Sequence, residues 1–258
     1  MSLDILFMLE TFVETLKGIP VTMGITLVAL VLAAPASWLM AIVRLRSIPF
    51  LADTAKFFTS LIRGTPIILQ ILLIYSLLPG VLNNLIRQSN ISYNIFDLNP
   101  IYYAFVVFAL NSSAGLSEII RSALLTVPHG QLEAAHAAGL STPQAYMRII
   151  MPQALVNALP NLCNLTVNLI KASSLAFIMT AKDITAIARI EASFGYNYIE
   201  AYIVIFVMYI ILCSLTQLLF NMAETRAGRY RAAASTRTSR FSLSRLFITA
   251  PSEVKLNA

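Results

Sequence analysis

The sequence predicts an all-α integral membrane protein, and composition gives the first reason. Of the 258 residues, 58% are hydrophobic and only 12% are charged, and the mean hydropathy is +0.76. A soluble domain of this length carries roughly twice that fraction of charged residues. The second reason is a series of apolar stretches of about 20 residues, which is the length that an α-helix needs to cross a bilayer.

Residues 1–19 precede the first of these stretches and predict an amphipathic helix on the extracytoplasmic membrane surface. Apolar side chains recur at helical spacing, at Ile5, Leu6, Leu9, Phe12, Val13 and Leu16. Acidic residues stand where a cleavable signal peptide carries positive charge, so we expect the segment to be retained.

Residues 20–225 are expected to form one transmembrane domain with five spanning helices. Their expected bounds are 21–43, 57–78, 101–124, 156–180 and 198–220. Cytoplasmic loops carry an excess of Lys and Arg, and Arg44, Arg46 and Lys56 lie between the first two spans. This places the N-terminus outside and the C-terminus in the cytoplasm.

The tail, residues 226–258, is strongly basic. Residues 221–258 hold seven Lys and Arg and two Glu, so +5 of the chain's net charge of +6 lies there. A nucleic-acid patch is one interpretation, but beside a membrane the simpler partner is anionic lipid, and no nucleic acid is expected. Its Ala, Ser, Thr and Arg composition predicts little fixed structure beyond a helix on the surface, and its role stays open.

The fourth span carries a polar stripe. Its members are Asn157, Asn161, Asn164, Asn168, Lys171 and Ser174, at steps of three and four residues that predict one helical face. A mid-helix lysine facing lipid costs about 2.5–3.5 kcal/mol, so this face should look into the bundle, a partner chain or a water-filled route. The alternative, that the asparagines only join helices together, stays open.

The third span carries a matching stripe of Asn111, Gly115, Glu118 and Ser122. Arg121 follows Glu118 by three residues and is its expected partner. At 1.5 Å per residue, Asn111 should lie near the level of Lys171, and Glu118 near Asn161, so no direct Glu118–Lys171 ion pair is expected. The substrate-pathway candidates are therefore Asn111, Glu118, Asn161, Asn164, Asn168, Lys171 and Ser174.

Between these spans, residues 127–155 predict a short helical hairpin on the cytoplasmic side. Gly139 is expected as a left-handed C-cap, and Ser141 or Thr142, Pro143 and Gln144 restart a helix with a capping box. Pro152 is expected to end this regular pattern, and Pro160 to mark entry into the fourth span. The bare, alanine-rich first helix predicts insertion into a groove on another protein.

The segment "EAAHAAGLSTPQAYMRIIMPQAL" resembles the EAA loop of bacterial ABC-importer permeases. "FTSLIRGTPIILQILLIY", "SEIIRSALLTVPHGQLEAA" and "LIKASSLAFIM" resemble further segments of the polar amino-acid permease family, in the same order, over roughly residues 11–225. The resemblance implies the type I importer fold, in which the EAA helix docks on a cytoplasmic ABC ATPase dimer. It assigns the coupling role to Glu133, Ala134, Ala135, Gly139 and Pro152.

The chain departs from the family pattern at two places. Lys171-Ala172 stands where the family commonly has Lys-Asp, and Gly115-Leu116 stands where it commonly has an aromatic residue before Ser-Glu. The first departure removes a charge partner of Lys171 and puts a borrowed substrate role there in doubt. The "KASSLAF" variant is similar to permeases for cystine and related sulfur amino acids.

The predicted function is the permease subunit of an ATP-driven amino-acid importer in the bacterial cytoplasmic membrane. The resemblance implies a second permease chain, identical or paralogous, and an extracytoplasmic substrate-binding protein. The chain lacks the phosphate-binding motif G-x-x-x-x-G-K-[ST], so ATP and Mg are expected in the partner ATPase, with no catalytic, metal or cofactor site here. The alternatives are an ion-coupled secondary transporter, which an odd number of spans without a visible repeat disfavours, and an intramembrane enzyme, which would need paired carboxylates or a nucleophile and base within the spans.

Overall fold

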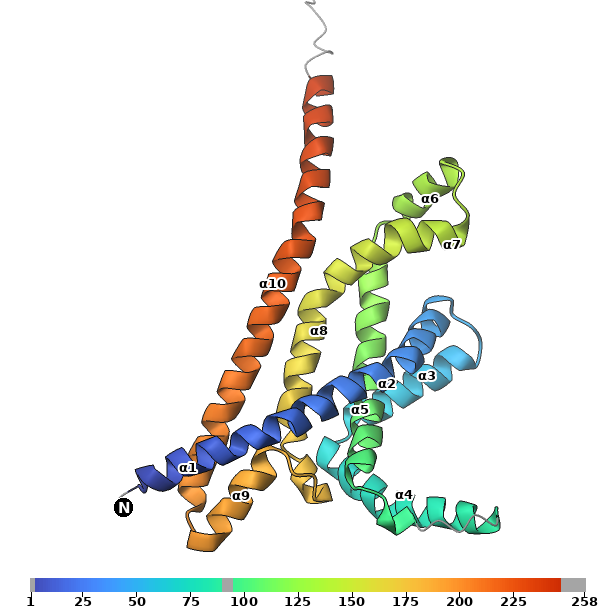
Figure 1. Cartoon of the computed structure of the whole chain (residues 1–258). Coiled ribbons are helices and arrows are strands. Elements are labelled where there is room, and N and C mark those ends of the chain that lie inside the picture. The colour runs from blue at the N-terminus through green and yellow to red at the C-terminus, as the bar shows by residue number, and fades with distance from the viewer. Residues whose placement is uncertain (1–2, 90–94, 247–258) are drawn as a thin grey trace, which may run out of the picture.

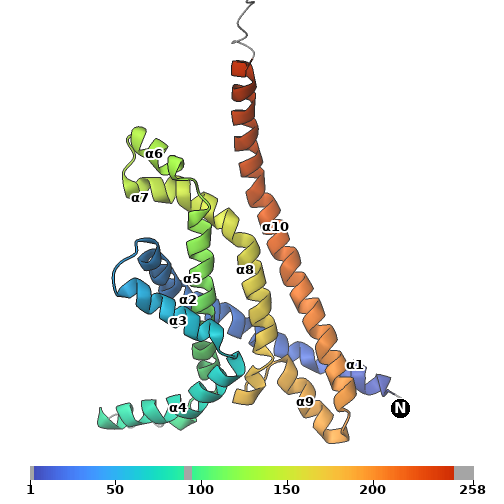
Figure 2. The same ribbon diagram turned by 180° about the vertical axis from the view of Figure 1, so that it is seen from behind.

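The computed structural model describes residues 3–89 and 95–246, with side chains except at residues 96 and 229–246, and these residues form helices without strands. The main helices are α1 (Ile5–Thr15), α2 (Ile19–Leu45), α3 (Leu51–Gly64), α4 (Ile67–Gln88), α5 (Ile101–Leu125), α6 (His129–Ala137), α7 (Thr142–Ala145), α8 (Met151–Ser173), α9 (Ile184–Gly195) and α10 (Tyr198–Leu246). The α6–α7 hairpin and the C-terminal half of α10 lie at one end of the molecule, while α1, α4 and α9 lie toward the other (Figures 1 and 2).

Four helical segments among the described residues are long and apolar enough to cross a membrane. They are Ile5–Leu45, Ile67–Gln88, Ile101–Leu125 and Tyr198–Gly228. The first joins α1 and α2 over 41 residues, roughly 60 Å at 1.5 Å per residue, so only part of it fits a hydrocarbon core of about 30 Å. The fourth expected span, α8, is not among the four, which agrees with its polar stripe, and its crossing stays a prediction.

The expected second span, 57–78, is wrong as a single helix. The chain breaks between α3 and α4, where Thr65 is extended with φ −113° and ψ 141°. Pro66 causes this, because a proline ring crowds the preceding residue out of the helical conformation. The sequence therefore holds two shorter helices where one continuous span was expected.

The expected bounds of the fourth span, 156–180, also need correction. Helix α8 already begins at Met151 and ends at Ser173, and a tight helical turn at Ala176–Met179 follows. Pro152 does not end the helical pattern but lies in the first turn of α8, where its missing N–H leaves little unsatisfied. Pro160 does not mark the helix entry either, because it lies inside α8.

The N-terminal segment is helical as expected, and it continues into α2 through a tight turn at Leu16–Gly18. Side chains of Ile5, Leu6 and Leu9 are exposed, while Thr11 is buried against the rest of the chain. Gly18 permits this packing, since a Cβ at that position would lie 2.5 Å from the backbone nitrogen of Ile184. The N-terminal segment is thus held against the start of α9.

The described part of the basic tail, residues 226–246, differs from the expectation of little fixed structure or a surface-lying helix, and residues 247–258 lie outside the described residues. Its backbone continues α10 without interruption as far as Leu246. Figures 1 and 2 show α10 as one long rod that extends past the α6–α7 hairpin at the same end of the molecule. An uninterrupted run of helix-compatible residues explains this, because no glycine other than Gly228 and no proline falls between Tyr198 and Leu246.

The core lies where α2 and α5 cross. Ala29 and Ala33 of α2, and Ala104 and Ala114 of α5, are fully or almost fully buried. Small residues allow helix backbones to approach closely, as in other membrane bundles. The Oγ of Ser37 in α2 donates to the carbonyl of Ser113 in α5 at 3.1 Å, and this joins the two helices across the core.

Candidate functional site

The α6–α7 hairpin has a rigid turn. The N–H of Gly139 donates to the carbonyl of His136 at 2.9 Å, and the N–H of Leu140 donates to the carbonyl of Ala135 at 3.0 Å. This pair of bonds is a Schellman C-cap, which requires a left-handed residue, and Gly139 has φ +79°. The left-handed C-cap predicted at Gly139 is confirmed.

The second half of the hairpin restarts with the expected capping box. The N–H of Ser141 donates to Oε1 of Gln144 at 3.0 Å, and Pro143 lies in the first turn. Ser141, not Thr142, is therefore the N-cap. Oγ1 of Thr142 lies 3.3 Å from Nε2 of His136, which adds a side-chain contact between the two helices.

The predicted coupling residues divide between the hairpin's surface and its interior. Glu133, Ala134, Gly139 and Pro152 are exposed, whereas Ala135 is buried. Helix α6 thus uses Ala135 for internal packing and presents Glu133 and Ala134 outward. An exposed, stiff helix with small side chains is suited to contact another protein.

The hairpin has a packed base that joins it to the membrane helices. Buried Val127 and Ile150 form one cluster with Ala123 of α5 and Ala154 of α8, and Leu132 of α6 packs against it. The amide of Asn157 in α8 also donates to Oγ1 of Thr126 at 2.5 Å. The base of the hairpin is thus packed against both α5 and α8.

The junction between hairpin and α8 is a single π-helical turn, Tyr146–Ile150. Pro152 lacks an N–H, and its ring would crowd the carbonyl of Arg148 in a regular helix, so the wider turn relieves the contact. Nε2 of Gln153 donates to the carbonyl of Ile149 at 3.0 Å, within the same turn. The bend between hairpin and span is thus hydrogen-bonded.

Four of the seven substrate-pathway candidates line one cavity, which we call the asparagine cavity. It has a volume of about 530 Å³ and lies between the α3–α4 junction, α5 and α8. Asn111 and Glu118 reach it from α5, and Asn161 and Asn168 reach it from α8. The expected level of Glu118 near Asn161 agrees with this arrangement.

Lys171 and Ser174 do not join them, and the expectation of one common polar face is wrong. On a helix with 3.6 residues per turn, the ten residues from Asn161 to Lys171 fall short of three full turns. Lys171 therefore lies about 80° around the helix axis from Asn161. Both residues instead line a second cavity of about 680 Å³ beside α9 and α10, the lysine cavity. Asn164 lines neither of these two cavities.

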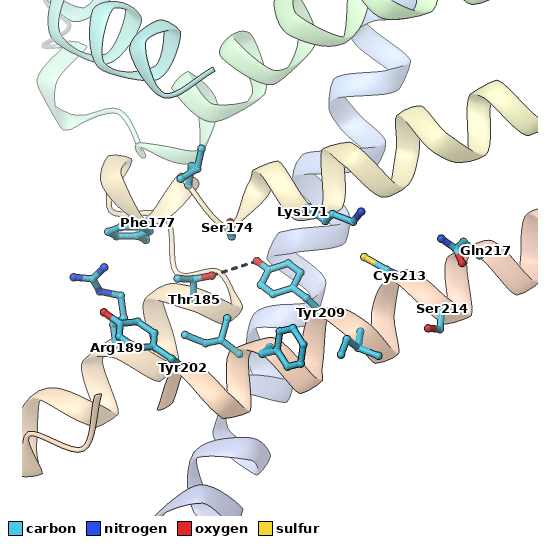
Figure 3. A pocket seen from close by; sticks show the side chains of 14 residues that line it. Lys171, Ser174, Phe177, Thr185, Arg189, Tyr202, Tyr209, Cys213, Ser214 and Gln217 are labelled. Carbon is cyan, nitrogen blue, oxygen red and sulfur yellow. Dashed lines mark hydrogen bonds between the residues drawn. The ribbon is translucent and has the colours of Figure 1, made fainter. Parts of the chain in front are cut away.

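The lysine cavity is shown in Figure 3. Arg189 lies beside the ring of Phe177, with its guanidinium carbon 4.5 Å from the ring centroid, which is a cation–π contact. Tyr209 projects from α10 and its hydroxyl lies 3.3 Å from Oγ1 of Thr185. Most of the remaining lining is apolar, so the two cations are the main chemical feature of this cavity.

Asp183 lies behind the lysine cavity, in the connection between α8 and α9. It is fully buried, and its Oδ1 accepts from the N–H of Ala186 at 2.8 Å as the N-cap of α9. The hydroxyl of Tyr209 donates to its Oδ2 at 3.2 Å. Burial raises the pKa of this carboxyl to about 6, although these hydrogen bonds act in the opposite direction.

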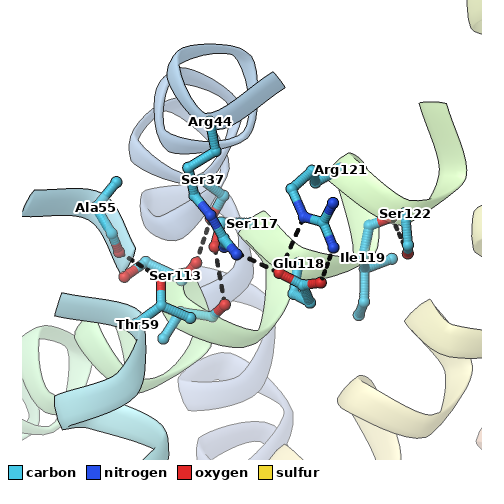
Figure 4. A network of polar contacts seen from close by, with 11 residues as sticks. Ser37, Arg44, Ala55, Thr59, Ser113, Ser117, Glu118, Ile119, Arg121 and Ser122 are labelled. Atoms are coloured by element: carbon cyan, nitrogen blue, oxygen red, sulfur yellow. Dashed lines mark hydrogen bonds and ion pairs between the residues drawn. The ribbon is translucent and has the colours of Figure 1, made fainter. Parts of the chain in front are cut away.

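Glu118 is the centre of an ion-pair network that joins α2 to α5 (Figure 4). The expected local pair with Arg121 is confirmed, and Nε of Arg121 lies 3.2 Å from Oε2 of Glu118. A second partner was not foreseen: Nη1 of Arg44 lies 2.9 Å from the same Oε2. The sequence places Arg44 in a loop between two spans, as a charge that sets orientation, and nothing in its spacing links it to Glu118.

Gln70 is the other residue that the sequence did not single out. Its Nε2 donates to the carbonyl of Ile62 at 2.8 Å and to Oγ1 of Thr65 at 2.9 Å, across the α3–α4 break. Its Oε1 accepts from the amide of Asn111 at 3.1 Å. A Pro66 break inside an expected span was the available signal, because the backbone groups that it frees need side-chain partners.

A model of the family described as binding-protein-dependent transport system inner membrane component matches residues 33–229. The chain is 34% identical to an L-cystine transport system permease protein of Bacillus subtilis (strain 168), over 85% of this chain and 90% of that protein.

Two solved structures resemble the fold. One is described as the crystal structure of an amino acid ABC transporter with histidines; it is 30% identical, has a TM-score of 0.72, and the match covers 88% of this chain and 100% of that one. The other is the MetNI methionine ABC transporter in an inward-facing conformation, at 18% identity and a TM-score of 0.62, covering 83% of this chain and 96% of that one. The second likeness concerns the fold alone.

Proposed function

The chain belongs to the family of binding-protein-dependent transport system inner membrane components and is an amino-acid ABC importer permease subunit. We propose that it carries a polar amino acid through the asparagine cavity, and that the α6–α7 hairpin controls this transport. The observation that carries this proposal is that the cavity and the hairpin share two helices. Helices α5 and α8 line the cavity, and the same two helices hold the base of the hairpin. A tilt imposed on the hairpin therefore alters the cavity. The family assignment favours the importer over the ion-coupled secondary transporter.

The coupling surface in this proposal is the exposed side of α6. Glu133 and Ala134 contact a cytoplasmic ABC ATPase dimer, which binds ATP and Mg and performs the hydrolysis. The hairpin is suited to this because its Schellman turn and capping box leave no free joint inside it. Coupling requires a piece that moves as a unit between two states.

The route for substrate in this proposal is polar and includes charged side chains. Amides of Asn111, Asn161 and Asn168 supply donors and acceptors for the amino and carboxyl groups of an amino acid. Glu118 is paired with Arg44 and Arg121, and Arg63, which has no ion pair among the described residues, also lines the cavity, so the cavity does not favour a cation. The guanidinium of Arg63 suits a carboxyl group of an amino acid.

Cystine, or a related sulfur amino acid, is the substrate that we propose. The support is the 34% identity to an L-cystine permease protein, together with Ala172 where the family commonly has an aspartate. A second permease chain, identical or paralogous, completes the pathway, and an extracytoplasmic binding protein delivers the substrate. The chain is placed in the bacterial cytoplasmic membrane with its N-terminus outside.

Uptake measurements test the route. Cells lacking the chain are complemented with wild type, Asn161→Leu, Asn168→Leu or the matched control Asn164→Leu, and uptake of labelled cystine is followed. We expect the two cavity variants to lose at least tenfold in uptake and the control to keep it. Equal loss of uptake in all three variants, with equal amounts of protein in the membrane, would rule out the asparagine cavity as the route. Uptake of other amino acids but not of cystine by wild type would rule out cystine as the substrate.

Isolation of the complex tests the coupling surface. Membranes are solubilised in mild detergent, and the complex is isolated through a tag on wild type, Glu133→Arg or Glu191→Arg. Glu191 lies on α9, at the opposite end of the molecule from α6 (Figure 1). Loss of an ATPase subunit only from Glu133→Arg supports the surface, while its retention there places the contact elsewhere.

A further inference from the structure

A third cavity lies at the end of α2, against α3, and it shares Arg63 and Glu118 with the neighbouring asparagine cavity. Its volume is about 630 Å³, and its lining includes Arg44, Lys56, Arg63 and Glu118. Three cations and one carboxylate give a formal charge of +2. Thr59 and Ser60 add hydroxyl groups beside the cations. We call it the basic cavity.

Among the described residues, Glu118 is the one acid that lines the basic cavity, and it already has partners. Glu118 is ion-paired with Arg121 of its own helix as well as with Arg44. Lys56 has Asp53 as a partner at 2.9 Å, but both side chains are mostly exposed and such pairs contribute little. Arg63 has no ion pair or hydrogen bond within the described part of the chain. Positive charge in the cavity is therefore under-compensated.

Arg44 is ion-paired with Glu118, but two of its side-chain nitrogens form no hydrogen bond with any residue that the structure describes. Its side chain is only 15% exposed. Its Nε has no hydrogen-bond acceptor among the described residues, and its Nη1 approaches Glu118 without hydrogen-bond geometry. A guanidinium with free N–H groups favours a planar or tetrahedral oxyanion, because two parallel bonds can form.

The outer face of α3 beside the basic cavity is apolar. Phe57 is 70% exposed and Leu61 is 50% exposed, and they follow Lys56 and Ser60 by one residue each. A cationic hollow next to exposed aromatic and aliphatic side chains suits a ligand with an anionic head and hydrocarbon chains. Basic hollows between helices on the cytoplasmic side of a membrane protein are known to hold anionic lipid heads.

We propose that the basic cavity binds the phosphate of an anionic membrane phospholipid, with its acyl chains along Phe57 and Leu61 of α3. Arg44 and Arg63 contact the phosphate from two helices, and Lys56 adds charge. The occupant would thereby hold α3 against the end of α2.

The test measures lipid binding to the full chain in detergent by native mass spectrometry, with phosphatidylglycerol as the probe and phosphatidylcholine as the uncharged comparison. Arg63→Gln and Lys56→Gln should each reduce phosphatidylglycerol binding about fivefold. Arg46→Gln is the matched control, because it removes the same charge near Arg44 but does not line the cavity. Arg44→Gln is not used alone, since it also breaks the pair with Glu118.

Equal phosphatidylglycerol binding by Arg63→Gln, Lys56→Gln and Arg46→Gln would overturn the proposal. Equal binding of phosphatidylcholine by wild type would also overturn it, since a neutral head would then suffice. Displacement of the lipid by an equal concentration of inorganic phosphate would show a site for free phosphate and overturn the lipid assignment. Selective loss in the two cavity variants, without such displacement, supports it.

Discussion

Asn111 and Gln70 join the third expected span to the break in the second. The amide of Asn111 donates to Oε1 of Gln70 at 3.1 Å, while Nε2 of Gln70 contacts backbone and side-chain oxygens on the α3 side of the break. Gln70 is buried, so these bonds form away from water. One side chain thus satisfies the open helix end and fixes one wall of the asparagine cavity.

Gln70→Leu should destabilise the protein. The change keeps the side-chain volume but leaves the carbonyl of Ile62 without its donor and the amide of Asn111 without its acceptor. Each unsatisfied buried group costs about 1–3 kcal/mol. We expect a lower melting temperature in detergent by several degrees, with Gln88→Leu, at the exposed end of α4, as control. Equal melting temperatures of the two variants would contradict the role of Gln70.

Gly139→Ala should weaken coupling because alanine resists the left-handed conformation. At φ +79°, a side chain costs about 1–2 kcal/mol even though no atom lies within 4 Å of the added Cβ. Gly130→Ala is the matched control, since the space there is also open and the backbone is helical, so about 0.5–1 kcal/mol should be gained. Transport-coupled ATPase activity of the reconstituted complex checks this. Normal coupled ATPase activity in Gly139→Ala, with reduced activity in Gly130→Ala, would contradict this prediction.

Glu118→Gln should loosen α2 from α5, because two arginines would lose their shared carboxylate. Hydrogen bonds to charged groups contribute about 1.5–3 kcal/mol, and partial exposure places the expected loss at the lower end. Asp53→Asn removes an exposed partner of Lys56 and should change the free energy of unfolding by less than about 1 kcal/mol. Thermal unfolding in one detergent compares them. A loss from Asp53→Asn as large as that from Glu118→Gln would contradict the special role of Glu118.

Asp183 should make stability depend on pH. Its pKa rises from 3.8 to about 6 on folding, mainly because burial disfavours the charged form. The folded chain therefore binds the proton more tightly than the unfolded chain, so stability is highest below about pH 4 and falls until about pH 6. At about 1.4 kcal/mol per pKa unit, the loss is about 3 kcal/mol.

Asp183→Asn is the variant that isolates this effect, because an asparagine oxygen can still cap α9. Melting temperature measured between about pH 4 and pH 7 should fall with rising pH in wild type and stay flatter in the variant. Asp97→Asn serves as a control on an exposed aspartate. A pH dependence that is unchanged by Asp183→Asn would assign it to other groups.

Several local features of α5 and the hairpin were predictable from sequence because they depend on near neighbours. The left-handed Gly139, the Ser141–Gln144 capping box and the Glu118–Arg121 pair each involve residues within a few positions of one another. Helix breaks were less predictable. Pro66 follows an extended Thr65 at the end of α3, whereas Pro152 lies in the first turn of α8 after a π-helical turn and Pro160 lies inside α8.

The sequence by itself determined that the chain is a helical membrane protein, because hydrophobic content and helical spacing are properties of single segments. It also determined the family resemblance and the local form of the hairpin. Only the tertiary structure decided which polar residues meet. Asn161 and Lys171 share a helix but face different cavities, and Arg44 reaches Glu118 from a helix 74 positions earlier in the chain. The physical reason is that rotation about each helix axis and the crossing of α2 with α5 are set by packing of small side chains across the whole bundle, which no single segment contains.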